Sequence, residues 1–136
     1  MEELKRKKNT IFRCLEMVRE SLELLRENAI PEYEKSLQDS VIKRFEYTID
    51  NFWKFIKLYL TEHEKIDLHL SSPKGILKEA VTNSIITTDE FKTLVQALNS
   101  RNLTSHVYRE EISLSILEKI PAYYEAMVDL LKKLTL

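Results

Sequence analysis

The stretch RNLTSHVY, residues 101–108, concentrates hydrogen-bonding and proton-transfer groups in a chain that is otherwise mostly leucines and charges. Arg101 carries a permanent charge on a forked set of donors, and His106 supplies an imidazole, which can accept or donate a proton. Cleavage of a phosphodiester within RNA needs a base for the 2′-hydroxyl proton, an acid for the leaving oxygen and a cation for the charged phosphorane. These two residue types can supply that chemistry without a metal ion or a cofactor.

The spacing of this pair limits how it can act. Arg101 and His106 are five residues apart, so they are not stacked neighbours on one continuous helix. They can cooperate near a frayed helix end or across a two-fold interface, and Tyr108-Arg109-Glu110 resembles a helix restart. A simpler interpretation is that the polar stretch caps a helix C-terminus and complements the helix dipole. Composition alone favours that simpler interpretation.

Other catalytic motifs are absent from the sequence. It has no Gly-rich phosphate loop, no HExxH and no cysteine ligand pair, so we predict no metal site. Its one cysteine, Cys14, lies in a helical pattern and is expected to be a buried hydrophobe rather than a nucleophile. His63 and His69 lie in a polar connection without a partner at metal-ligand spacing, and we expect both to be solvated.

The elements that must position these residues are predicted to be helices. Among 136 residues, glycine occurs once and proline three times, which favours an all-α fold. Apolar residues recur at helical spacing over about residues 1–25 and again over 32–62, with a break at Pro31. The two segments are expected to form an antiparallel hairpin.

Three further helices are expected after this hairpin. Ser72 followed by Pro73 predicts the start of a short third helix. Thr87, with Glu90 three residues later, resembles a capping box that opens a fourth helix. A fifth helix is expected from about residue 109 to 134, kinked or interrupted at Pro121. The sequence therefore predicts an up-and-down bundle of about five helices in one domain, 1–136.

Charge and hydropathy limit the kinds of partner that the chain can bind. A net charge of −1 gives no global case for nucleic-acid binding, so any contact would rest on a local patch. The first candidate patch is the run Lys5 to Lys8, which Glu2 and Glu3 partly offset. No apolar run approaches the ~20 residues of a membrane span, and MEELKRKKNT is not followed by an apolar segment. We therefore expect a cytoplasmic protein without membrane contact.

The second predicted helix carries three features of interest. Trp53 fits the apolar stripe and is expected in the core rather than as a base-stacking platform. Glu46 could pair with Arg101, although a solvated carboxylate is the safer expectation. The helix also holds a second, weaker basic candidate, made of Lys43, Arg44, Lys54 and Lys57.

The pattern R-x-x-x-x-H-x-Y, here Arg101, His106 and Tyr108, resembles the signature of HEPN-domain proteins. More narrowly, the chain resembles the HepT-like branch, described as nucleotidyltransferase substrate-binding proteins. Three other stretches resemble that branch in the same order, so the similarity covers most of the chain. They are DSVIKRFEYTIDNFWKFIKLYL, SSPKGILKEA and IPAYYEAMVDLL.

The resemblance implies an all-α bundle that pairs into a two-fold homodimer, in which the arginines and histidines of both subunits share one cleft. Active members are metal-independent endoribonucleases that act as toxins, and a minimal nucleotidyltransferase is their antitoxin. The resemblance implies that Arg101 holds the scissile phosphate of RNA and that His106 transfers protons. It implies that Asn102 orients a partner group. Thr104 and Ser105 match variable positions and are given no role.

In this branch the nucleotidyltransferase can adenylylate the motif tyrosine, here Tyr108. An extended backbone between His106 and Tyr108 would place both side chains on the same side of the chain. An added AMP would then put negative charge where the RNA phosphate must lie. The alternative function is a non-catalytic subunit that presents a substrate to a nucleotidyltransferase, and the near-neutral charge of the chain motivates it.

Overall fold

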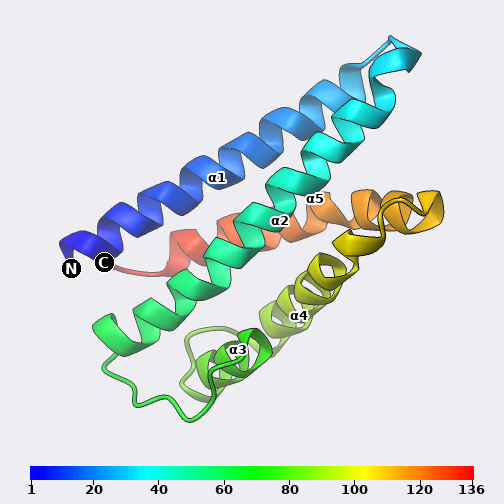
Figure 1. Ribbon diagram of the computed structural model, residues 1–136. Helices are drawn as coiled ribbons and strands as arrows, with labels where there is room; N and C mark the ends of the chain where they lie inside the picture. The colour runs from blue at the N-terminus through cyan, green and yellow to red at the C-terminus, as the bar shows by residue number, and fades with distance from the viewer.

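The computed structural model describes all residues, 1–136, and contains five α-helices and no strand, as predicted. The first two helices form a long antiparallel hairpin joined at a 3₁₀ turn, η1 (Pro31–Tyr33) (Figure 1). None of the helices combines the length and the apolarity needed to cross a bilayer. In chain order the helices are α1 (Glu2–Glu27), α2 (Glu34–Leu58), α3 (Pro73–Thr82), α4 (Thr88–Leu103) and α5 (Glu110–Lys133).

The hydrophobic core is one cluster of 27 buried residues to which all five helices contribute. α2 lies at its centre and packs against the other four helices. Phe45 of α2 stacks on Tyr123 of α5, with 5.6 Å between the ring centroids. The two ends of the chain lie side by side (Figure 1), where Lys8 Nζ donates to the carbonyl of Leu134 at 2.6 Å. Lys8 is therefore part of the fold rather than a free steering charge.

Both predicted helix-start signals are confirmed. The Ser72 hydroxyl accepts the Gly75 N–H at 3.0 Å at the start of α3. At the start of α4, the Thr87 hydroxyl accepts the Glu90 N–H at 3.1 Å, and the Glu90 carboxylate accepts the Thr87 N–H at 2.8 Å. These bonds satisfy N–H groups that have no partner within the first turn of a helix.

The connection between α2 and α3 is tied down by a buried carboxylate. Glu79 Oε1 accepts the backbone N–H groups of His69 and Leu70 at 2.9 and 3.2 Å. The connection then passes close over the first turn of α3, where the chain has its only glycine. A Cβ on Gly75 would lie 2.7 Å from Leu70 Cβ and 2.8 Å from Ser72 Oγ. The absence of a side chain there permits this close approach.

The end of the second helical segment differs from the prediction. Residues Tyr59–His63 form a π turn, η2, in which the side chain of Tyr59 is buried. The His63 ring stacks on Tyr59 with 4.6 Å between centroids, and His63 Nδ1 lies 2.6 Å from a carboxylate oxygen of Glu64. The expectation that His63 is solvated is wrong, because the π turn directs its ring onto Tyr59. His69 is exposed, as expected.

α5 runs without interruption through Pro121, so of the two predicted outcomes at this position, a kink or an interruption, the interruption is wrong. Pro121 is exposed, whereas Ile120 and Tyr123 on either side of it are buried. A proline inside a helix costs about 3 kcal/mol, and each large apolar side chain that is buried contributes about 1.5–3 kcal/mol. Burial of the inward face of α5 is therefore sufficient to keep the helix continuous.

Candidate functional site

The stretch RNLTSHVY, residues 101–108, spans the break between α4 and α5. α4 ends at Leu103, and one 3₁₀ turn, η3 (Thr104–His106), leads to α5, whose N-cap residue is Arg109. The predicted helix end is thus confirmed. The backbone at Val107 is helical rather than extended, with φ −71° and ψ −6°. The turn nevertheless brings His106 and Tyr108 together, by a different route from the extended backbone considered above.

The Arg101 guanidinium is held by side chains from α2 and η3. Its Nε donates to both carboxylate oxygens of Asp50 at 3.0 and 3.1 Å, and its Nη2 donates to Asp50 Oδ2 at 3.1 Å. Its Nη1 donates to the Thr104 hydroxyl at 3.0 Å, and Thr104 donates to Glu46 Oε2 at 2.7 Å. A guanidinium has five N–H groups. Three are used here, so two N–H groups on the terminal nitrogens remain for a ligand.

The electrostatics of this Arg101 network follow from its hydrogen bonds. The bonds to Asp50 raise the pKa of Arg101 above its usual value, so its charge is permanent. Burial raises the pKa of Glu46, but hydrogen bonds from Thr104 and Lys43 and the charge of Arg101 together hold that pKa below its usual value. Two carboxylates, Glu46 and Asp50, stand against two cations, Arg101 and Lys43, so the network has no net positive charge. An anionic substrate at Arg101 therefore needs additional cations nearby.

Part of this network was not predicted from the sequence. Asp50 was not considered, and Thr104 was given no role. The expectation that Glu46 is solvated is wrong, because its side chain is 21% exposed and lies 3.6 Å from Arg101 Nη1. Glu46 and Asp50 stand four residues apart on one face of α2, where like charges repel unless a cation lies between them. That spacing is the signal that could have identified the pair.

His106 and Tyr108 form a second, more exposed pair. The Tyr108 hydroxyl lies 3.5 Å from His106 Nδ1, at the long limit of a hydrogen bond, and the rings meet edge to face with 6.0 Å between centroids. Tyr108 is 78% exposed, and Asn102 is also exposed. None of the hydrogen bonds or ion pairs of Arg101 reaches His106. One chain alone therefore does not join the predicted active pair.

Two hollows meet at the Arg101 network. The first, which we term the arginine cleft, has a volume of about 580 Å³ and includes Asp50, Trp53, Lys54 and Arg101. The second, the tyrosine hollow, has a volume of about 340 Å³ and is lined by residues that include Lys35, Asp39, Lys43, Glu46 and Tyr108. The network therefore has an accessible surface on both sides.

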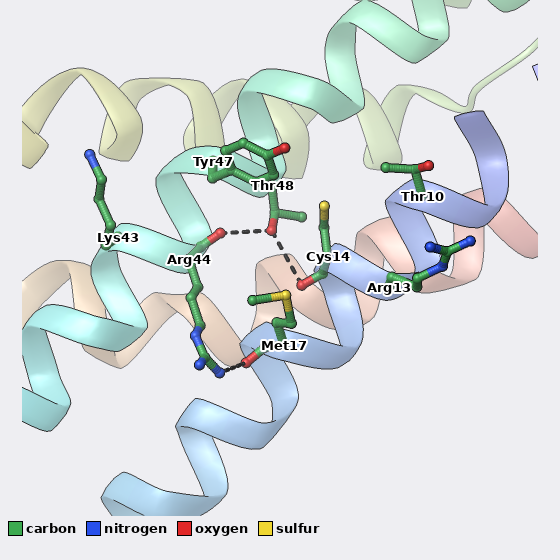
Figure 2. A pocket seen from close by; sticks show the side chains of 8 residues that line it. All are labelled: Thr10, Arg13, Cys14, Met17, Lys43, Arg44, Tyr47 and Thr48. Atoms are coloured by element: carbon green, nitrogen blue, oxygen red, sulfur yellow. Dashed lines mark hydrogen bonds between the residues drawn. The ribbon is translucent and has the colours of Figure 1, made fainter. Parts of the chain in front are cut away.

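A third hollow of about 490 Å³, the α1–α2 groove, lies on the hairpin and contains none of the predicted site residues (Figure 2). Thr48 donates to the carbonyl of Arg44 at 2.7 Å, and Arg44 Nη1 donates to the carbonyl of Met17 at 2.8 Å. Cys14 in this groove is 6% exposed, and burial raises the pKa of its thiol. It is thus a buried cysteine with no activated thiolate, as predicted.

A family model described as "nucleotidyltransferase substrate binding protein like" matches residues 8–136. The chain belongs to this family. The match confirms the resemblance seen in four stretches of the sequence, and it extends over nearly the whole bundle. No curated protein sequence matches this chain.

Solved structures show which fold the family member shares. A protein from Thermus thermophilus is 30% identical to it, covering 86% of this chain and 98% of that chain, with a TM-score of 0.69. A mutant of the toxin–antitoxin MntA-HpeT is 17% identical, covering 97% of this chain and 98% of that chain, with a TM-score of 0.69. A tri-AMPylated Shewanella oneidensis HEPN toxin in complex with MNT antitoxin is 18% identical, covering 95% and 96%, with a TM-score of 0.68. The fold is that of HEPN toxins.

Proposed function

We propose that the chain is the toxin of a toxin–antitoxin pair, a metal-independent endoribonuclease with Arg101 and His106 as its active pair. The observation that carries the proposal is the break between α4 and α5. It presents an oriented, permanently charged guanidinium with two unused N–H groups, and one turn later an exposed imidazole. Membership of the substrate-binding-protein family and the HEPN fold support it.

In the proposed reaction His106 accepts the proton of the 2′-hydroxyl, whose oxygen attacks the adjacent phosphorus, and the bond from phosphorus to the 5′-oxygen breaks as that oxygen takes a proton from water. The two unused N–H groups of Arg101 donate to the non-bridging oxygens as negative charge accumulates on them. Asn102, exposed next to Arg101, orients a partner group. Because no contact joins Arg101 to His106 within one chain, we propose that a two-fold homodimer brings them into one cleft.

The competing function is a non-catalytic subunit that presents a substrate to a nucleotidyltransferase. The two carboxylates beside Arg101 favour it, because they weaken the attraction of the arginine for a polyanion. Both functions are compatible with the family description. Toxicity on expression without the partner separates them.

The test is growth of a bacterial host that expresses the chain alone. We expect growth arrest with the wild-type chain and normal growth with His106→Ala at the same level of folded protein. His69→Ala is the matched control, since His69 is an exposed histidine remote in sequence from the site, and we expect it to arrest growth. Harmless expression of folded wild type would support the substrate-presenting subunit, and arrest by His106→Ala would remove His106 from the mechanism.

We also propose that a partner nucleotidyltransferase adenylylates Tyr108. The phenol is 78% exposed at the edge of the tyrosine hollow, where Lys35 and Lys43 can pair with nucleotide phosphates. Intact-mass spectrometry of the co-expressed pair should show added AMP on the wild-type chain and none on Tyr108→Phe. Tyr47→Phe, at another exposed tyrosine, should keep the modification. Neutralised activity in an unmodified chain would instead indicate steric occlusion by the partner.

A further inference from the structure

The arginine cleft extends from Arg101 over the C-terminal half of α2. Trp53 and Lys54 from α2, Lys74 from the first turn of α3 and Asn102 from α4 border it together with Arg101. Its volume of about 580 Å³ lies within the range of about 300–1,000 Å³ that is typical of sites for small ligands. The cleft therefore has room for a nucleotide unit beside the group that would hold the scissile phosphate.

Trp53 is the only tryptophan of the chain and is placed between the core and this cleft. We expected Trp53 to be a core residue. It does pack against the core, but its side chain is half-buried rather than fully buried. Lys54 Nζ lies 6.0 Å from the centroid of the indole. Aromatic rings accompanied by basic side chains are the usual platform on which proteins stack single-stranded bases.

Charge distinguishes the arginine cleft from the tyrosine hollow. The cleft has three cations, Lys54, Lys74 and Arg101, against one carboxylate, Asp50, which is already bonded to Arg101. The tyrosine hollow balances two lysines with two carboxylates. A polyanion that approaches Arg101 is therefore attracted to the cleft side of the network.

The basic surface continues beyond the cleft. An adjoining hollow of about 480 Å³ between α1 and α2 shares Lys54 with the cleft and adds Arg6 and Lys7, against the single carboxylate of Glu3. The N-terminal basic run thus borders a hollow that meets the cleft at Lys54. Together the two hollows form a route with cations along its length.

We propose that single-stranded RNA occupies this route, with the base next to the scissile phosphate stacked on Trp53 and flanking phosphates at Lys54 and Lys74. The strand then continues toward Arg6 and Lys7. This inference rests on the proposed function, because Arg101 marks the position of the scissile phosphate. It assigns Trp53 as a substrate-binding residue and Lys54 as a phosphate contact.

Tryptophan fluorescence tests the stacking directly, because Trp53 is the single reporter. Full-length His106→Ala protein, which should bind without cutting, is titrated with oligouridylate and with the same ribose-phosphate chain lacking one or more bases. We expect saturable quenching by oligouridylate, and about tenfold weaker binding with little quenching by the abasic chain. Binding of oligouridylate with no change in Trp53 fluorescence would overturn the proposal.

Substitutions in the same background test the individual contacts by fluorescence anisotropy of labelled RNA. We expect Trp53→Leu, which keeps apolar packing, to weaken binding about tenfold and Trp53→Phe to weaken it less. Lys54→Ala should lower the slope of log affinity against log salt by about 0.7. Arg13→Ala removes a cation from the α1–α2 groove and should leave that slope unchanged. Equal losses in Lys54→Ala and Arg13→Ala would mean diffuse binding and overturn the proposal.

Two further outcomes separate this inference from the proposed function. If wild type cleaves RNA while Trp53→Leu binds and cleaves normally, the stacking subsite is wrong and the nuclease remains. If RNA quenches Trp53 but wild type and His106→Ala are equally inert, the nuclease is wrong and the RNA-binding cleft remains. Loss of self-association in Trp53→Leu with unchanged RNA affinity would show that this face binds protein, and would also overturn the subsite.

Discussion

At the scale of single residues, the orientation of Arg101 is the central feature. Asp50 occupies the Nε edge of the guanidinium and Thr104 occupies one N–H of Nη1. The fork is thereby fixed with its remaining donors on the terminal nitrogens. A carboxylate beside a phosphate-binding arginine weakens the attraction of that arginine for the substrate. It also holds the side chain in one orientation, so the arginine loses less conformational freedom when a phosphate binds. We regard Asp50 as a positioning residue.

Asp50→Asn is expected to lower kcat of RNA cleavage about 10- to 100-fold with a smaller change in KM, because the guanidinium is no longer held in one orientation. The half-buried ion pair contributes about 1 kcal/mol to stability, so the thermal midpoint should change little. Asp129→Asn, at an exposed position of α5, is the matched control. Unchanged kcat in Asp50→Asn would show that Arg101 does not depend on Asp50.

Glu46 should make folding stability depend on pH. Its pKa is lower in the folded chain than the unperturbed value of 4.5, so its carboxylate stabilises the fold fully above that value. The contribution disappears as pH falls through the lower folded pKa. Glu46→Gln should therefore lower the free energy of unfolding by up to about 1 kcal/mol at neutral pH and by progressively less below pH 4.5. Urea denaturation across this range measures it, and a pH-independent difference would contradict it.

Residue-level prediction from the sequence succeeds where a motif is local. Arg101, His106 and Tyr108 stand within eight residues and form one recognisable pattern. Asp50 is 51 residues from Arg101, and nothing local indicates that they meet. The position of Trp53 between the core and the arginine cleft was not predictable for a similar reason. A helical stripe shows that a side chain faces inward, but not that a cleft opens beside it.

At the scale of secondary-structure elements, helix starts were predictable because capping is local chemistry between residues three apart. The π turn at Tyr59–His63 and the continuous α5 through Pro121 were not predictable in the same way. Both depend on burial against other helices, which outweighs local preference. The elements that border the arginine cleft are held by both kinds of interaction. Ser72 caps α3 locally, and Glu79 ties down the connection that precedes it.

Gly75→Ala tests the close approach at the start of α3. Helix propensity alone predicts a gain of up to about 1 kcal/mol, because alanine is a better helix former than glycine. The new Cβ would lie 2.7 Å from Leu70 Cβ, and overpacking of this kind costs about 1–3 kcal/mol. We therefore expect a net loss of about 1–2 kcal/mol by thermal denaturation. Lys78→Ala, at an exposed position of α3, should be near neutral. A stabilised Gly75→Ala would refute the close approach.

At the scale of the whole molecule, the bundle presents Arg101 and His106 without a contact between them. A two-fold homodimer would resolve this, and sedimentation should show a dimer at micromolar concentration. Mixed dimers of Arg101→Ala and His106→Ala subunits should regain part of the activity, because one cleft then receives Arg101 from one copy and His106 from the other. A stable monomer that cleaves RNA would rule out the composite cleft.

The most direct test of the account is cleavage of RNA by the purified protein in the presence of EDTA. The 2′-hydroxyl mechanism predicts cleavage that persists without metal and leaves products ending in a 2′,3′-cyclic phosphate or in the 2′- or 3′-phosphate formed from it. Arg101→Ala and His106→Ala should abolish it, whereas His69→Ala should leave it intact. The proposed nuclease mechanism would be contradicted by cleavage that EDTA abolishes, by products that lack these ends, or by equal activity in the His106→Ala protein.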